Sequence, residues 1–264
     1  MTTCFISKEI SQFLKHRRAN LPAGSYGFSI GHRRGTGLRR EEVAQLSGVS
    51  VTWYTWLEQG KDIRVSRSML RRLADALRLN ETEHRYLIGL IEQREAVLNN
   101  DPNDGLPDSI LKTIDAIGTP AFVRNACWDM LYWNSSAAEY VGNWTNLSTP
   151  LNILRLAFRD EKHQSTILDW ERTAREMVAQ FRSDFGQHAR YPGMSTLIEE
   201  LLTCSEIFKS NWARQEVLRR ETGLRTFRHP LRGDITFERA CLKIDFLDTL
   251  KLEVYIPLSP KVDT

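Results

Sequence analysis

The segment from Leu38 to Gly60 constrains the fold more than any other part of the sequence. It reads as a helix, a tight turn and a second helix, because Gly48 permits the positive φ that ends a helix and Ser50 can cap the next one. Ala44, in the first helix, is small enough for the second helix to cross close by. The segment therefore predicts two short helices that pack against each other.

The second helix of this segment, about Val51 to Gln59, carries large apolar side chains on its outer face. Tyr54 and Leu57 point inward at a three-residue spacing, which leaves Trp53 near the edge. The side chains turned outward are Val51, Thr52, Thr55 and Trp56. Outward valine and tryptophan cost solubility unless they meet a partner, and they suit the thymine methyl groups of a major groove.

The rest of residues 1–98 is also predicted to be helical. Start signals lie at Ser66 and in the capping-box sequence Asn80-Glu81-Thr82-Glu83. Apolar residues recur at helical spacing in three further groups: Ile6, Ile10, Phe13 and Leu14; Met69, Leu70, Leu73, Ala74 and Leu77; and Leu87, Leu90 and Ile91. The expected fold of this part is an all-α bundle of five helices.

The charge is unevenly distributed along the chain. Residues 1–98 hold 16 basic and 10 acidic residues, whereas residues 99–264 hold 20 and 23, so the net charges of +6 and −3 give +3 for the whole chain. Local basicity of this kind suits either a polyanionic partner or a solvated surface. The run from Asn99 to Gly105 is rich in turn residues and Pro107 follows, so we expect domains at 1–98 and 107–264 with a linker at 99–106.

The second half predicts an α+β domain with two strands, then helices, then three strands. A short hairpin is expected around Asn125, and a strand from Leu224 to Leu231. The C-terminal positions Leu250, Leu252, Val254 and Ile256 alternate with Lys251, Glu253 and Tyr255, which predicts a half-buried strand. Ile235 and Phe237 are out of phase with Leu242 and Ile244, so we expect a bulge near Glu238 to Ala240.

The helix-turn-helix segment closely resembles that of the XRE family of transcription regulators, and Leu38 to Arg64 is similar to its MmyB-like branch. The residues that carry the resemblance are Arg39-Arg40-Glu41-Glu42-Val43-Ala44 and Trp53-Tyr54-Thr55-Trp56-Leu57-Glu58-Gln59-Gly60. One departure is local, since the branch usually has a proline before Leu38 and this chain reads Gly35-Thr36-Gly37.

The resemblance implies that the helix Val51–Gln59 enters the major groove of double-stranded DNA. On that pattern the residues at the bases would be Val51, Thr52 and Trp56, flanked by Trp53 and Thr55. The residues at phosphates would be Arg33, Arg34, Arg39, Arg40, Lys61 and Arg64. Because one such helix contacts few base pairs, we expect a homodimer on an inverted-repeat operator.

The second half resembles the PAS-like ligand-binding domain of MmyB-like regulators, in Thr119-Pro120-Ala121-Phe122-Val123, Trp128 to Asn134, Arg219 to Gly223 and His229-Pro230-Leu231. An aromatic-rich set forms either a plain core or the lining of a pocket: Phe122, Met130, Tyr132, Trp133, Phe181, Phe208, Trp212, Phe227 and Phe237. Arg219 and Arg228 are expected either to anchor an acidic group or to form surface ion pairs. The implied ligand is small and largely apolar, similar to a fatty acid.

Other functions lack their sequence signals. The four cysteines have no Cys-x-x-Cys spacing and the histidines no ligand spacing, so we expect reduced thiols, no metal and no cofactor. Catalytic and phosphate-binding motifs are absent, and no stretch approaches the ~18 apolar residues of a membrane helix, so a cytoplasmic non-enzyme is expected. Two alternatives remain, a second domain that only dimerises, and an enzyme or carrier tethered to DNA.

Overall fold

The structure of the chain is a computed structural model that describes residues 2–29, 35–61, 63, 65–95, 106–141, 151–218, 223–244 and 248–258. The chain forms two compact units. The first consists of Met1–Leu98 together with two later segments, Arg182–Arg190 and Gln215–Val217. The second consists of Asn99–Phe181, Tyr191–Arg214 and Leu218–Thr264. Most of the expected linker, residues 99–105, lies outside the described residues.

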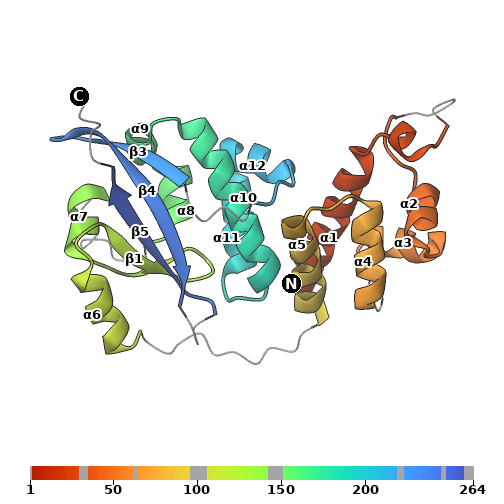
Figure 1. Ribbon diagram of the computed structural model, residues 1–264, viewed down its shortest axis with the longest axis horizontal. Helices are drawn as coiled ribbons and strands as arrows, with labels where there is room; N and C mark the ends of the chain where they lie inside the picture. Colours follow the sequence, from red (N-terminus) through yellow and green to blue (C-terminus); the bar gives the residue numbers. More distant parts are fainter. Residues whose placement is uncertain are drawn as a thin grey trace. The chain divides into compact units, whose positions relative to one another are not determined.

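Within its described residues, the N-terminal part of the first unit contains five α-helices, as predicted (Figure 1). They are α1 (Thr2–Ala19), α2 (Arg40–Ser47), α3 (Val51–Glu58), α4 (Arg67–Ala76) and α5 (Glu81–Glu95), with a short 3-10 helix η1 (Ala23–Tyr26). The predicted caps are confirmed. The Ser66 hydroxyl accepts from the amide of Met69 at 3.3 Å, and Asn80 and Glu83 exchange backbone-to-side-chain hydrogen bonds of 2.9 Å.

The departure at Gly35-Thr36-Gly37 has a steric explanation at its last residue. Gly37 forms an isolated antiparallel bridge with Pro22, at the end of the loop that begins after α1. A Cβ at Gly37 would lie 2.3 Å from the carbonyl oxygen of Ala19, which is far inside van der Waals contact. Only glycine fits at this crossing of the chain.

The second unit is an α+β domain, as predicted. Its helices are α6 (Asp108–Ala116), α7 (Ser135–Val141), α8 (Ile153–Arg159), α9 (Glu161–Thr166), α10 (Trp170–His188), α11 (Met194–Cys204) and α12 (Glu206–Ala213), of which α10 also contributes to the first unit. Its strands are β1 (Ala121–Arg124), β2 (Met130–Trp133), β3 (Gly223–His229), β4 (Gly233–Lys243) and β5 (Lys251–Pro257). The order along the sheet is β2-β1-β5-β4-β3, and every neighbouring pair is antiparallel.

The prediction of a bulge near Glu238 to Ala240 was wrong. β4 pairs with β3 from Gly233 to Arg239 and with β5 from Phe237 to Lys243, in unbroken register. The change of phase arises because the two pairs use opposite faces of the sheet: Phe237 packs against Phe227 and Tyr255, whereas Ile244 packs in the cluster of Ile114. Leu242, which shares the phase of Ile244, is 53% exposed. The irregularity in register falls instead between Val123 and Arg124 of β1, opposite β2.

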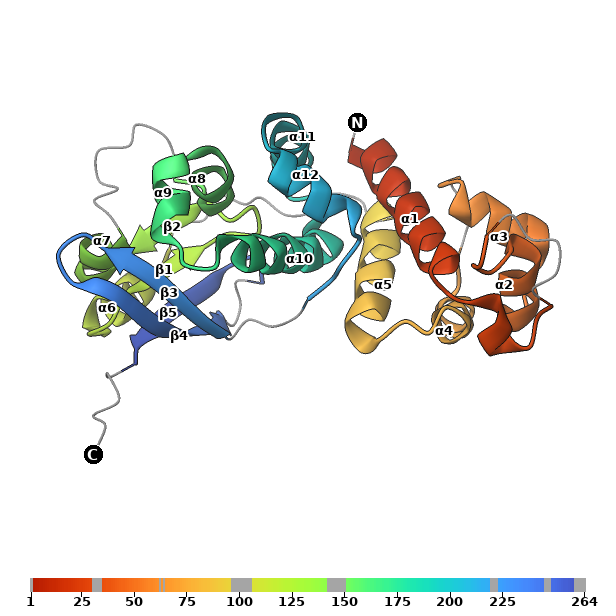
Figure 2. The ribbon, with the colours of Figure 1, turned by 90° about the horizontal axis from the view of Figure 1, so that it is seen from above.

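The two faces of the sheet are covered differently (Figures 1 and 2). On one face Ala121 and Val123 of β1 pack with Ile114 of α6, and Leu252 and Val254 of β5 complete this cluster. On the other face lie α8, α9 and the first half of α10. We call the second face the inner face.

The inner face of the sheet carries a buried ionic cluster. Glu253 of β5 is 2% exposed and lies between the guanidinium groups of Arg124 on β1 and Arg239 on β4. Arg124 Nε donates to Glu253 Oε1 at 2.7 Å, and Arg239 Nη2 donates to the same oxygen at 3.0 Å. Burial would raise the pKa of Glu253, but the positive charges of Arg239 and Arg124 outweigh it and lower that pKa to about 2. The carboxylate therefore stays charged inside the domain.

This cluster makes the stability of the second unit depend on pH. An unfolded chain takes up a proton at the ordinary glutamate pKa of 4.5, and the folded chain only near 2, so the free energy of unfolding should fall by about 3 kcal/mol as pH drops from 5 to 2. Glu253→Gln should remove most of this contribution from Glu253, while costing about 3–5 kcal/mol at pH 7 because two arginines lose their counter-charge.

Urea unfolding of the second unit at several pH values measures both effects. Glu238→Gln is the matched control, since Glu238 lies on β4 facing outward and is exposed. It should change stability by less than about 0.5 kcal/mol. If the free energy of unfolding of the Glu253→Gln protein falls as steeply with pH as that of the unchanged protein, the acid dependence does not come from Glu253.

Candidate functional sites

The outer face of α3 is apolar and exposed, as its sequence predicts. Val51 is 44% and Trp56 43% exposed, and Thr52 is also exposed. Tyr54 and Leu57 are fully buried. The helix therefore offers a short row of methyl groups and one indole ring to a partner.

The turn before α3 is built as expected. Gly48 has φ +62°, in the left-handed region, and ends α2. The Ser50 hydroxyl accepts from the amide of Trp53 at 3.1 Å and so begins α3. Arg72 of α4 donates through Nε to the carbonyl oxygen of Ser47 at 2.9 Å, which satisfies one of the terminal acceptors of α2.

A buried carboxylate holds α3 in place. Arg18 of α1 donates through Nε to Glu58 Oε2 at 2.6 Å, and Arg40 of α2 donates through Nε to Glu58 Oε1 at 2.7 Å. Burial raises the pKa of Glu58, but the bonds and charges of these two arginines lower it overall. The side chain of Arg40 is 42% exposed, so an anchored guanidinium faces solvent beside α3.

Two of the other basic residues predicted at phosphates, Arg39 and Lys61, lie in the described part of the chain. Arg39 is exposed, and its backbone amide donates to Glu42 Oε2 at 2.8 Å at the start of α2. Lys61 Nζ lies 5.5 Å from the centre of the Trp56 ring, within cation–π range. Three of the predicted residues lie outside the described residues, namely Arg33, Arg34 and Arg64.

The second unit contains a cavity of about 70 Å³ between the inner face of the sheet and helices α8, α9 and α10. Three of the predicted pocket residues line it: Phe122, Met130 and Phe227. Helix α10 contributes Thr173 and Met177 to the same lining. Most of the surface of the cavity is apolar.

The remaining predicted pocket aromatics lie elsewhere. The hydroxyl of Tyr132 donates to Asp115 on α6, and Trp133 packs in the small cluster of Phe122. Three others pack ring against ring in one aromatic cluster that also contains Phe158 and Trp128, namely Phe181, Phe208 and Trp212. Phe237 packs its ring against Tyr140, Phe227 and Tyr255. For these residues the plain core interpretation describes the packing better.

The expected anchoring arginines also lie elsewhere. Arg228 forms an exposed ion pair with Asp234 at 2.9 Å, which is the surface alternative, and Arg219 lies outside the described residues. The charged side chains that do line the cavity are Arg225, Arg239 and Glu253. Sequence reasoning missed them because it expected the charged positions of an alternating strand to face solvent. The available signal was the shared inward phase of Arg225 with Phe227 and of Glu253 with Tyr255.

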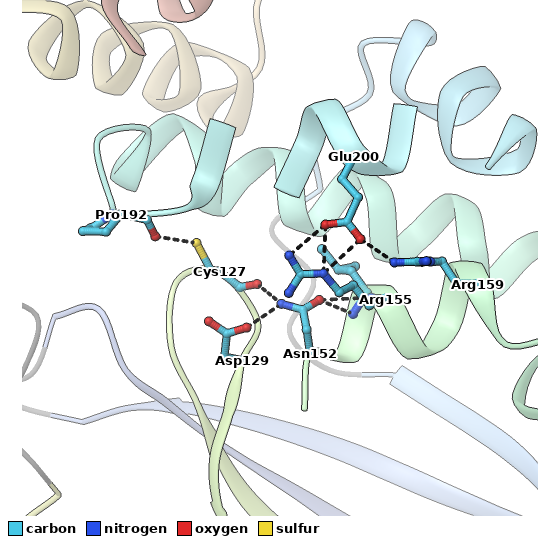
Figure 3. A network of polar contacts seen from close by, with 8 residues as sticks. Cys127, Asp129, Asn152, Arg155, Arg159, Pro192 and Glu200 are labelled. Atoms are coloured by element: carbon cyan, nitrogen blue, oxygen red, sulfur yellow. Dashed lines mark hydrogen bonds and ion pairs between the residues drawn. The ribbon is translucent and has the colours of Figure 1, made fainter. Parts of the chain in front are cut away.

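The turn between β1 and β2 is fixed by a polar network (Figure 3). Asn152 Nδ2 donates to the carbonyl oxygen of Cys127 and to Asp129 Oδ1, each at 2.8 Å, and its Oδ1 accepts from the first amides of α8. Arg155 of the same helix is paired with Glu200 of α11 at 2.8 Å. The network thus ties the turn to α8, and α8 to α11.

This network positions Trp128, which lines the cavity from the tip of the turn. Trp128 has φ +65°, a strained value for a residue with a Cβ, and the Arg124 guanidinium lies 4.3 Å from its ring centre. The neighbouring Cys127 donates to the carbonyl oxygen of Pro192, and burial raises the pKa of its thiol to about 12. Cys127 is therefore protonated near neutral pH and unsuited to nucleophilic chemistry.

The described parts of the chain contain no cluster of histidine, cysteine, aspartate or glutamate that could hold a metal ion. None of their helices is long and apolar enough to cross a membrane.

Comparison with known families identifies a domain in each half of the chain. Residues 9–87 match a helix-turn-helix domain, and residues 106–264 match the MmyB-like transcription regulator ligand binding domain. No curated protein matches the chain. The second match spans more than half of the sequence and contains the whole cavity, while the first contains α3 and its supporting arginines. The chain therefore belongs to the family of MmyB-like transcription regulators.

Proposed function

We propose that this regulator binds a specific operator through the outer face of α3 and senses a small, largely apolar acid in the cavity of its second unit. The observation that carries the ligand proposal is a mostly apolar cavity with two buried arginines in its wall, Arg225 and Arg239. A pocket with an apolar body and a few placed polar groups is the usual form of a small-molecule site. The regulator would act in the cytoplasm.

The charges around the cavity favour an anionic group on the ligand. Arg225 is paired with Glu176 at 2.7 Å, while Arg124 and Arg239 share Glu253. Three buried or nearly buried cations thus face two carboxylates. A carboxylate on a ligand would give Arg225 or Arg239 a further charged partner at the wall of the cavity, which a neutral ligand would not.

The volume of the cavity limits the size of the ligand. Seventy cubic ångströms is about half of the roughly 150 Å³ of an engineered apolar cavity that binds benzene. A short acid fits with little rearrangement, whereas a long-chain acid requires lining side chains such as Met130 and Met177 to move. Methionine is the residue best suited to such movement because its side chain is unbranched and flexible.

Substitutions in and beside α3 should distinguish contacts to bases from contacts to phosphates. Trp56→Ala and Thr52→Ala should each weaken binding to the operator by about 1–3 kcal/mol and binding to random DNA very little, because base contacts carry sequence specificity. Arg40→Ala should weaken both DNAs alike and reduce the salt slope by about one, because one fewer counterion is released.

The operator for this test comes from selection of bound sequences out of random oligonucleotides, using the whole chain. Affinities are then measured at several salt concentrations by fluorescence anisotropy. Equal losses on operator and random DNA for the Trp56 and Thr52 variants would remove α3 from the recognition surface.

A homodimer is the second part of the proposal. One helix of eight residues reads too few base pairs for genomic specificity, so two copies should bind inverted half-sites about one turn apart. Sedimentation velocity should give a dimer on the selected operator, with two chains per duplex. A monomer both free and on DNA would overturn this part.

The ligand proposal is tested with straight-chain carboxylic acids and the primary alcohols of the same length. Acids should bind more tightly than alcohols in titration calorimetry, by about tenfold, because a charge-assisted hydrogen bond contributes about 1.5–3 kcal/mol. Phe227→Ala should weaken binding, since its ring lines the cavity. Leu224→Ala is the matched control, because Leu224 lies on the same strand with its side chain exposed. Absence of binding for every acid in the series would favour a second unit that only dimerises.

A further inference from the structure

Helix α10 is a single 19-residue helix that contributes to both compact units. Trp170 to Phe181 belong to the second unit, and Arg182 onward belong to the first. Figure 2 shows the helix along its length. Within the described residues, the two halves have different neighbours, and each half is tied to them by buried polar contacts.

The first half of α10 forms a wall of the cavity. Thr173 and Met177 line it directly, and both are buried. The same half also holds the two arginines of the cavity. Glu176 is paired with Arg225 at 2.7 Å, and Gln180 Oε1 accepts from Arg239 Nη1 at 2.8 Å.

An occupant of the cavity would therefore touch α10 side chains or the arginines that α10 holds. Binding could not leave the surroundings of this helix unchanged.

The second half of α10 is anchored in the first unit by Arg182, whose side chain is fully buried. Its Nη1 donates to Glu9 Oε2 of α1 at 2.8 Å and to the hydroxyl of Tyr86 of α5 at 3.0 Å. It also donates to Gln215 Oε1 at 3.0 Å. A buried charge with this many partners fixes the helix in one position, because any shift breaks several charge-assisted bonds at once.

A glycine contact gives a second, independent constraint. A Cβ at Gly89 of α5 would lie 2.1 Å from the carbonyl oxygen of Gly186 in α10, and a Cβ at Gly186 would lie 2.4 Å from Cδ2 of Tyr86. Both glycines lie inside helices, where glycine is disfavoured, so the close approach of the two backbones explains their presence. Packed contacts of this kind shift in steps rather than deform continuously.

We propose that α10 is the coupling element of this regulator, so that filling the cavity changes the packing of α1 and α5 through Arg182 and the Gly89–Gly186 contact. This inference rests on the proposed function, since it assigns the cavity to a ligand and the first unit to DNA. Its content is separate. It states that a change in the wall of the cavity reaches α1 and α5 through α10.

The test needs no ligand, because truncation of Met177 changes the cavity from the α10 side. In hydrogen–deuterium exchange of the whole chain, Met177→Ala should speed exchange of amides in α1 and α5 at least threefold. Leu197→Ala is the matched control, since Leu197 is also buried, lies on α11 and is outside the cavity lining. It should alter exchange in the second unit and leave α1 and α5 unchanged. Met177→Leu repeats the measurement should the alanine variant fail to fold.

A double-mutant cycle identifies the route. Tyr86→Phe removes the hydroxyl that meets Arg182, and Tyr54→Phe makes the same change at a buried tyrosine of α3. The effect of Met177→Ala on α1 and α5 should shrink at least twofold in the Tyr86→Phe background and persist in the Tyr54→Phe background. An equal effect in both backgrounds, or unchanged exchange in α1 and α5 with faster exchange in β3–β5, would overturn the proposal.

The same variants separate this proposal from the proposed function. On the selected operator, Met177→Ala should change the DNA affinity at least threefold, and this change should disappear with Tyr86→Phe. Failure to select any DNA would refute operator binding, while the exchange data would still decide the coupling. If the unchanged protein and the Met177→Ala variant bind the selected DNA with the same affinity, the coupling is refuted and operator binding stands.

Discussion

The second unit depends on one buried ionic interaction, the carboxylate of Glu253 between the guanidinium groups of Arg124 and Arg239. It joins three strands of the sheet on the face that borders the cavity. Apolar residues of the same volume could replace such a cluster without loss of stability. They would also remove Arg239 and Glu253 from the wall of the cavity and leave Arg225, which is paired with Glu176, as the charged side chain there. Under the proposed function, the cluster serves the recognition of a polar group in the cavity as well as the stability of the sheet.

The first unit uses the same arrangement at its own site. Glu58, at the end of α3, lies between Arg18 of α1 and Arg40 of α2. In both units one buried carboxylate joins two arginines from different elements, and burial of the carboxylate is outweighed by the two positive charges. The difference is exposure. Arg40 reaches solvent beside α3, where a phosphate can approach, whereas Arg239 is buried and lines the cavity.

The helix-turn-helix could be predicted in detail because its determinants are local. Gly48, Ser50 and the spacing of Tyr54 and Leu57 each act within one or two turns of helix. The charged lining of the cavity could not be predicted in the same way, because alternation in a strand shows that its two faces differ and does not show which face is buried. In β5 the charged Glu253 is buried deeply, because one partner, Arg239, lies on the preceding strand β4 and the other, Arg124, lies on β1, far away in the sequence. The phase that Glu253 shares with Tyr255 places it on the inner face, but the local pattern does not identify the arginines that neutralise it there.

Under the proposed coupling, the size of the cavity and the anchoring of α10 together determine how this regulator responds to a ligand. A ligand shifts an equilibrium only if it binds the two states with different affinity. At about 70 Å³ the cavity admits little beyond a short acid, so a larger occupant has to displace Met177 or the turn at Trp128. Displacement of Met177 acts on the same helix that Arg182 holds against α1 and α5. Because coupling is reciprocal, an operator that favours one position of α10 must change the affinity for the ligand by the same factor.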